Sequence, residues 1–152
     1  MKIRIDIDEN LNDEEVVIKC RYMDSEIQAL QQSIASAAMH RDRFAVCRKD
    51  REYYLRLEDI LFFETEGIHI NVHTGKDMYE TDLRLYELEE LLPGHFMRVS
   101  KSAIVNVNHI YSVSRNLASS SILEFYGTSK QIYVSRHYYR PLKNKLEEMR
   151  RK

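Results

Sequence analysis

The chain has 152 residues, of which 43% are hydrophobic and 31% are charged, and its formal net charge is −1. This length allows one ordinary domain, or one domain with a small appendage, and the composition is that of a globular protein. No apolar run approaches the roughly 20 residues needed to cross a bilayer, and no leader of charged and then apolar residues follows Met1, so we expect a cytoplasmic protein.

The first forty residues are expected to form a β-β-α segment. Residues 2–7 alternate isoleucines with charged residues, which is the period of a half-buried strand, and residues 15–20 form a second apolar run. Asp24 and Ser25 then open a helix that carries apolar residues at helical spacing. The polar residues 40–43 are the best candidate linker. They separate an N-terminal extension, residues 1–40, from a domain at residues 44–152.

From Phe44 onward, short apolar runs alternate with turns, which predicts a mainly β domain. The expected strands are 44–48, 52–57, 59–64, 68–73, 78–81, 97–99, 103–105, 109–114, 122–126 and 130–134. Turns rich in glycine and polar residues separate several of them, as at 49–51 and 74–77. Leucines at helical spacing between Leu83 and Leu92 predict a short helix that ends at Pro93-Gly94.

A closing helix is expected over residues 135–151. Pro141 lacks a backbone donor and its ring clashes with the preceding turn, so we expect the regular helix to begin near residues 138–140.

Charge is distributed unevenly along the chain. Residues 57–95 hold ten acids and two bases, a balance of −8, whereas residues 96–152 hold eleven bases and three acids, a balance of +8. A basic C-terminal third suits a polyanionic partner, either nucleic acid or a membrane surface. The alternative is that folding interleaves the two segments so that they neutralise each other.

The run 68–73 is the first candidate binding segment. In a strand its three polar residues, His69, Asn71 and His73, lie on one face, where they could serve recognition. An ordinary solvated sheet face gives the same pattern. Two histidines four residues apart in a strand are roughly 13 Å apart, too far to bind one metal ion together.

Two basic segments are the other candidates. Arg98, Ser100, Lys101 and Ser102 offer cationic and hydroxyl donors for phosphate oxygens, although a cationic turn is usually only solvated. Residues 130–152 hold eight Lys or Arg and two Glu, and Arg136, His137 and Tyr138 lie near the head of this segment. A basic helix start offers backbone donors and a positive dipole end to an anion. The alternative is a solvated helix that packs through Leu142, Leu146 and Met149.

No catalytic arrangement is evident. The chain has no phosphate-binding loop, nucleophile elbow or metal-binding H-E-x-x-H motif, so we expect no enzyme activity, no cofactor and no small-molecule substrate. Cys20 and Cys47 lie in β-like runs outside any C-x-x-C pattern, and we expect them to be buried free thiols.

Three blocks of the sequence resemble the LytTR family of DNA-binding domains. They are YYLRLEDILFFETEG at 53–67, FMRVSKSAIVN at 96–106 followed by Ile110, and VSRHY at 134–138. Their order and spacing match across about Phe44 to Glu147.

The resemblance implies an elongated arrangement of antiparallel sheets that contacts DNA through loops. Side chains from three loops would enter successive grooves. The first loop and its strand would supply His69 and Asn71, the second Lys101, and the third Arg136 with His137 and Tyr138. Arg98, Ser100 and Ser102 would contact the DNA backbone or support the loops. A slip of one residue exchanges Arg136 and His137, so the choice between them stays open.

The resemblance also implies a transcription regulator that binds double-stranded DNA at repeated sites. Residues 1–40 are too short for a receiver domain, so we expect the stand-alone class, which is often controlled by a membrane-protein partner. The N-terminal segment is either a docking or homodimer surface or a stabilising extension of the sheet. The alternative function is a protein-interaction module in which residues 1–40 bind a partner and the basic tail reads no DNA.

Overall fold

The computed structural model describes residues 1–12, 14–40, 43–115 and 121–150. The chain divides into two compact units, Met1–Ala38 and Met39–Lys152. Across the described ranges, no helix has both the length and the apolar character that a membrane span requires.

The first unit contains helix α1 (Ser25–His40). The Asp24 carboxylate accepts a hydrogen bond from the backbone N–H of Ile27 at 2.8 Å, which caps the helix as expected. Ile27, Leu30 and Ile34 are half-buried along one side of it.

The two N-terminal strands predicted from the sequence are not formed. Residues 1–12 and 14–24 contain no strand, and their apolar side chains are largely exposed. Period-2 alternation shows that an extended chain would have one apolar face, but a strand also needs a neighbour to pair with. The β-β part of the predicted β-β-α segment is therefore wrong for the isolated chain, and the α part is confirmed.

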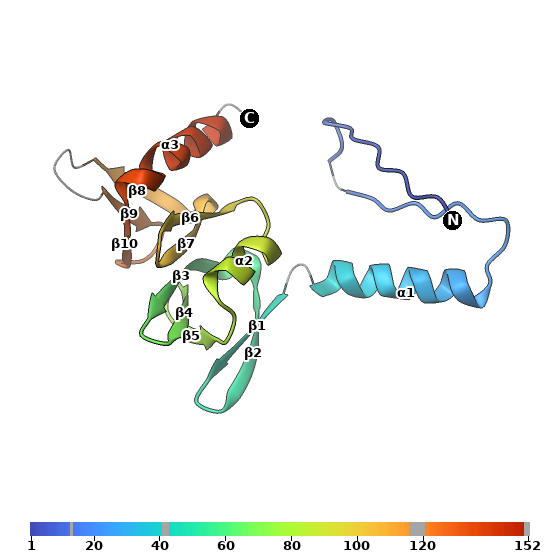
Figure 1. The fold of residues 1–152 in the computed structure, drawn as a ribbon, viewed down its shortest axis with the longest axis horizontal. Coiled ribbons are helices and arrows are strands. Elements are labelled where there is room, and N and C mark those ends of the chain that lie inside the picture. The colour runs from blue at the N-terminus through green and yellow to red at the C-terminus, as the bar shows by residue number, and fades with distance from the viewer. Residues whose placement is uncertain (13, 41–42, 116–120, 151–152) are drawn as a thin grey trace. The chain divides into compact units, whose positions relative to one another are not determined.

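The second unit is mainly antiparallel β structure, as predicted (Figure 1). Its elements are β1 (Arg43–Arg48), β2 (Arg51–Arg56), β3 (Ile60–Glu66), β4 (His69–Thr74), β5 (Met78–Thr81), α2 (Leu85–Leu91), β6 (Phe96–Ser100), β7 (Ala103–Asn106), β8 (Ile110–Ser114), β9 (Ser121–Phe125), β10 (Gln131–Val134) and α3 (Arg136–Arg150). Short 3-10 turns at Leu57–Asp59 and Val107–His109 lead into β3 and β8. The described residues form a seven-stranded sheet, in the order β2-β1-β5-β4-β3-β7-β6, and a three-stranded sheet, in the order β10-β9-β8.

The predicted hairpins are confirmed. β4 pairs with β5, and β1 pairs with β2 in a register that leaves Lys49 and Asp50 as a two-residue turn. These two residues have φ values of 49° and 64°. Positive φ at both central positions matches the right-handed twist of the flanking strands, although asparagine and glycine adopt it more readily.

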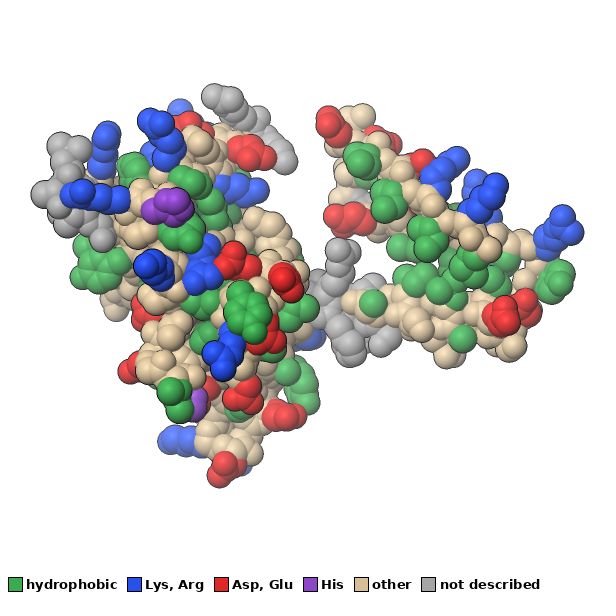
Figure 2. Space-filling model, in the orientation of Figure 1, with side chains coloured by type: hydrophobic (Ala, Val, Ile, Leu, Met, Phe, Trp, Pro, Cys, Tyr) green, Lys and Arg blue, Asp and Glu red, His purple; other side chains and the backbone are tan. Residues whose placement is uncertain are grey.

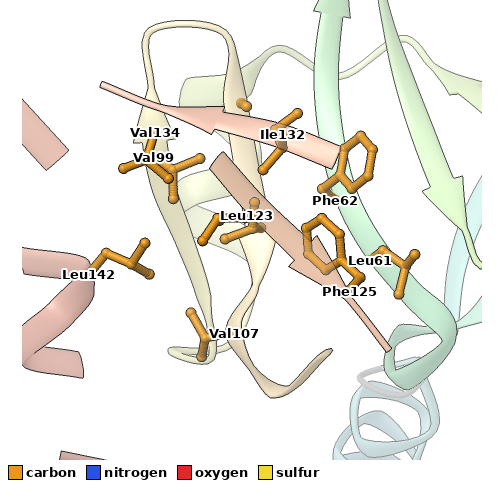
Figure 3. Close-up of a cluster of buried hydrophobic side chains, with 11 residues drawn as sticks. Leu61, Phe62, Val99, Val107, Leu123, Phe125, Ile132, Val134 and Leu142 are labelled. Atoms are coloured by element: carbon orange, nitrogen blue, oxygen red, sulfur yellow. The ribbon is translucent and has the colours of Figure 1, made fainter. Parts of the chain in front are cut away.

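Strand β3 is buried on both faces, which explains its nearly continuous apolar run. Phe63 packs in a cluster with α2 and strands of the large sheet, whereas the adjacent Phe62 points into a second cluster. In that second cluster, side chains of β9, β10 and α3 meet those of β3 and β6 (Figure 3). Leu123 and Leu142 are fully buried there. The small sheet and α3 thus cover one face of the large sheet.

Two sequence-based expectations fail in this part of the fold. Helix α3 begins at Arg136, so the first turn is regular despite Pro141, whose missing N–H only frees the carbonyl of His137 in the first turn. Cys47 and Cys20 are exposed, not buried. Cys47 points away from the core because its neighbour Val46 takes the inward position of β1.

Candidate nucleic-acid interface

The first predicted binding segment, residues 68–73, begins in the β3–β4 turn and continues along β4. Glu66 and His69 face each other across the turn, and Gly67 adopts a φ of 62°, a conformation that favours glycine. Ile68 at the tip is 94% exposed, so it does not face the core as the alternation suggested. The His69 side chain is about half exposed, with its Nδ1 4.0 Å from a carboxylate oxygen of Glu80. His69 is therefore available to a ligand at the end of the sheet.

The two other polar residues of this strand are covered. Asn71 is only 4% exposed, and its side-chain amide donates a hydrogen bond to the Glu66 carboxylate. His73 is half-buried with its ring stacked on Phe62, at 4.3 Å between centroids. The predicted solvated or recognition face is thus open only at its His69 end. The small sheet packs at the His73 end, since Phe62, on which His73 stacks, also stacks on Phe125 of β9.

His73 is held neutral. Its pKa is lowered to about 4, chiefly by burial and also by the Lys130 ammonium, while Glu66 acts in the opposite direction. Its Nδ1 is buried without a hydrogen-bond partner. This histidine belongs to the packing between the two sheets, and among the residues that the structure describes no cluster of three His, Cys, Asp or Glu could hold a metal ion.

The β6–β7 turn forms the second segment. The guanidinium of Arg98 donates to the main-chain carbonyls of Ser100, at 2.8 Å, and Lys101, and it forms an ion pair with Glu89 of α2. The Ser100 hydroxyl accepts from the backbone N–H of Ser102 at 3.1 Å. Lys101 is exposed in this braced turn. Of the donors predicted here, Lys101 faces solvent, whereas Arg98, with 22% of its side chain exposed, shapes the turn.

The third segment is the junction of β10 and α3. The Ser135 carbonyl accepts from the N–H of Tyr138 at 3.1 Å, which closes the first turn of the helix. Arg136 and His137 are exposed. Tyr138 is half-buried against the core, and its ring lies edge-on to the ring of His137, at 4.9 Å between centroids. Tyr138 therefore anchors the segment that carries Arg136 and His137.

Two backbone hydrogen bonds join the three segments into one row. The N–H of Thr65, at the end of β3, donates to the carbonyl of Ser102 at 2.8 Å. The N–H of Ser135 donates to the carbonyl of Val99 at 2.9 Å. The β6–β7 turn consequently lies between the other two segments. Four residues of this row have exposed side chains, and we call them the loop row: His69, Lys101, Arg136 and His137.

Charge separates in the fold much as it does along the chain. Basic side chains gather over α3 on the face shown in Figure 2, and acidic ones gather over and below α2. Particular contacts interleave the two segments, such as the Arg98–Glu89 ion pair and the ammonium of Lys130, which donates to the carbonyls of Thr74 and Asp77 at 2.9 and 2.8 Å. Much of the basic charge over α3 stays on the surface.

The β3–β4 turn also carries acidic charge that the sequence did not mark as part of a site. Burial and the nearby Glu66 raise the pKa of the Glu64 carboxyl. Glu66 itself is held by Asn71. Carboxylates here oppose phosphate oxygens but can accept a hydrogen bond from the amino group of cytosine, so this turn is better suited to a base edge than to the DNA backbone.

The mainly antiparallel β fold is that of a DNA-binding domain. Residues 50–147 match the family model for the LytTr DNA-binding domain. The chain belongs to this family. Among the described elements, no two helices follow one another along the chain.

Similar proteins extend the match beyond this domain. An uncharacterized HTH-type transcriptional regulator of Staphylococcus aureus strain NCTC 8325 is 27% identical over 148 residues, which cover 96% of this chain and 98% of the relative. One from strain MSSA476 is 32% identical over 99 residues, 64% of this chain and 66% of the relative. A solved LytTr DNA-binding domain from Bacillus cereus superposes with a TM-score of 0.61 at 25% identity, covering 66% of this chain and 95% of that one.

Proposed function

We propose that this protein is a sequence-specific transcription regulator that binds double-stranded DNA through the loop row. The observation that carries the proposal is the pair of hydrogen bonds, Thr65 to Ser102 and Ser135 to Val99, that places three exposed polar segments side by side. Membership of a DNA-binding family and the similarity to transcriptional regulators support the same function.

The exposed residues take the direct contacts. Lys101 and Arg136 can donate to guanine edges in the major groove, and His69 can donate or accept there. Arg136 and His137 are both exposed at the start of α3, so a base contact by one leaves the other for the backbone. The helix start itself favours a phosphate because its first N–H groups and its dipole are positive.

The less exposed residues of the predicted site hold the exposed ones in place. Arg98 and Ser100 brace the turn that carries Lys101, Asn71 orients Glu66, and Tyr138 fixes the start of α3. Ser102 is exposed, and its hydroxyl lies 3.2 Å from that of Ser100, so it can also reach a phosphate.

We further propose that residues 44–152 act as the DNA-binding domain and residues 1–40 as a separate interaction segment. A regulator of this kind works in the cytoplasm and binds repeated DNA sites as paired protomers. It needs no cofactor and catalyses no reaction. A membrane-protein partner controls its activity. Family resemblance supports the partner, and the division into two compact units supports the boundary.

Alanine substitutions test the loop row directly. We expect His69→Ala and Arg136→Ala each to weaken binding to the specific site by about 1–3 kcal/mol, the usual value of a base contact, without unfolding the domain. The measurement is a titration of labelled duplex that carries the site and of a scrambled duplex.

Arg51→Ala is the matched control, because Arg51 is exposed on β2, at the opposite edge of the large sheet from β6. It should bind both duplexes as the wild type does. Wild-type affinity of either loop variant for its site would show that the corresponding loop does not read DNA.

A further inference from the structure

Residues 1–8 lie before the first turn of the chain and pair with none of the described strands. Ile3, Ile5 and Ile7 are 90%, 82% and 89% exposed, although they alternate as the apolar face of a strand would. On the opposite face the Arg4 guanidinium pairs with the Asp6 carboxylate at 2.7 Å. Isoleucines with this exposure need cover from some other strand or surface.

The chain's own second apolar run is a poor partner for this segment. Antiparallel pairing that brings Ile5 opposite Ile18 would also place Ile3 and Ile7 opposite Cys20 and Val16. That register sets Arg4 opposite Lys19, Lys2 opposite Arg21 and Asp8 opposite Glu15. Like charges directly opposite each other destabilise a strand pair. This accounts for the missing hairpin in residues 1–12 and 14–24.

A second copy of the same segment is a good partner. When two copies run antiparallel with Ile5 opposite Ile5, Ile3 of each lies opposite Ile7 of the other. On the other face, Lys2 lies opposite Asp8 and Arg4 lies opposite Asp6. Each apolar residue then meets an apolar residue, and each base meets an acid. A parallel pair would instead put every charge opposite its own copy.

We propose that residues 2–8 form an antiparallel strand pair with a second copy of this chain, about a two-fold axis through Ile5. The contact is isologous, because the same surface serves both partners, and it closes at two chains. Its four cross-strand charge pairs fix the register, and its six isoleucines form one apolar face.

Other apolar surface in the same unit can cover that face. A two-stranded ribbon alone is marginally stable in water, so it needs additional packing. Val16 and Val17 are 68% and 65% exposed, and α1 carries the half-buried stripe of Ile27, Leu30 and Ile34. The loop row belongs to the other unit, so none of its residues takes part in this pairing.

The inference deepens the paired protomers of the proposed function, but its test needs no DNA. Failure of the dimer and failure of DNA recognition are therefore observed separately.

Cysteine cross-linking tests the register. In the full chain with C20S and C47S, which remove the native thiols, Ile5→Cys places the two new sulfurs on residues directly opposite each other. Facing residues have Cα atoms about 4.5–5.5 Å apart, within disulfide range. Ile3→Cys is the matched control, since its own copy would lie roughly 13 Å away along the ribbon.

We expect the Ile5→Cys chain to form a covalent dimer at least about tenfold faster than the Ile3→Cys chain. Mixing the Ile3→Cys chain with an Ile7→Cys chain should restore fast cross-linking as a mixed dimer. Equal rates for the Ile5→Cys and Ile3→Cys chains, or no covalent dimer from the Ile5→Cys chain, would overturn the proposal.

Charge reversal tests the pairing without cysteines. K2E/R4E makes the segment wholly acidic and D6K/D8K makes it wholly basic, so each should raise the dimer dissociation constant at least about tenfold in sedimentation. An equimolar mixture of the two should form heterodimers, and the chain with all four charges exchanged should dimerise again. Unchanged self-association of either reversed chain would refute the proposed register.

Discussion

The ring of His73 gives the fold a stability that depends on pH. It lies stacked on Phe62 between the two sheets, and its pKa is lowered from 6.5 to about 4, chiefly by burial. The unfolded chain binds a proton near pH 6.5 that the folded chain binds only near pH 4. The neutral ring's contribution to stability is therefore complete above pH 6.5 and is lost as the pH falls toward 4.

The size of the effect follows from these two pKa values. Between pH 7.5 and pH 5 they correspond to about 2 kcal/mol of lost stability, which we reduce to about 1 kcal/mol because the ring is partly exposed to solvent. The assay is urea unfolding at several pH values across this range, compared with His73→Phe, which keeps a stacked ring without a titrating group. We expect the wild type to lose about 1 kcal/mol more than the variant. Parallel pH profiles for the two proteins would refute this role of His73.

Two other predictions concern turns. Replacing Lys49-Asp50 by Asn-Gly should raise the free energy of unfolding by about 0.5–1 kcal/mol, because those residues adopt positive φ more readily, and an unchanged or lower value in thermal and urea unfolding would contradict the turn geometry. Arg98→Ala should weaken DNA binding by about 1–3 kcal/mol and speed amide exchange at Ser102, because the turn that carries Lys101 loses its brace. Arg98→Lys should restore little of the lost DNA affinity, since one ammonium cannot replace the planar guanidinium with its several donors. Normal amide exchange at Ser102 in the Arg98→Ala variant would show that the turn does not need Arg98.

The strands and helices of the second unit could be predicted because local chemistry and tertiary packing agree there. Alternation, turn residues and the leucine spacing of α2 place nearly every element. The start of α3 was misplaced for a local reason. Pro141 lies just beyond the first turn, where it costs one hydrogen bond but does not stop the helix.

The site was predicted less completely than the fold. The resemblance pointed to three segments, which the structure brings side by side, while DNA contact by the loop row stays a prediction. Sequence pattern could not show that Asn71 is buried or that His73 packs toward the small sheet, because period-2 alternation gives the two faces of a strand but not what packs on each. The role of Arg98 was hidden for a related reason, since its partner Glu89 lies on another element.

The N-terminal segment shows the opposite error. Its alternation was real, but a strand needs a neighbour, and the charges of residues 15–21 repel those of residues 2–8 in the register that the apolar residues require. A pattern that predicts a strand in one chain can thus describe half of a strand pair between two chains.

Selection of bound duplexes from a random pool at physiological salt, followed by a salt titration on the winning sequence, tests the central claim most directly. We expect one motif to be enriched as spaced repeats. Affinity for this motif should fall steeply with salt while the motif keeps its advantage over random DNA. A pool that stays random, with binding no stronger than the nonspecific background, would contradict DNA recognition by the loop row and favour a protein-interaction role for residues 1–40.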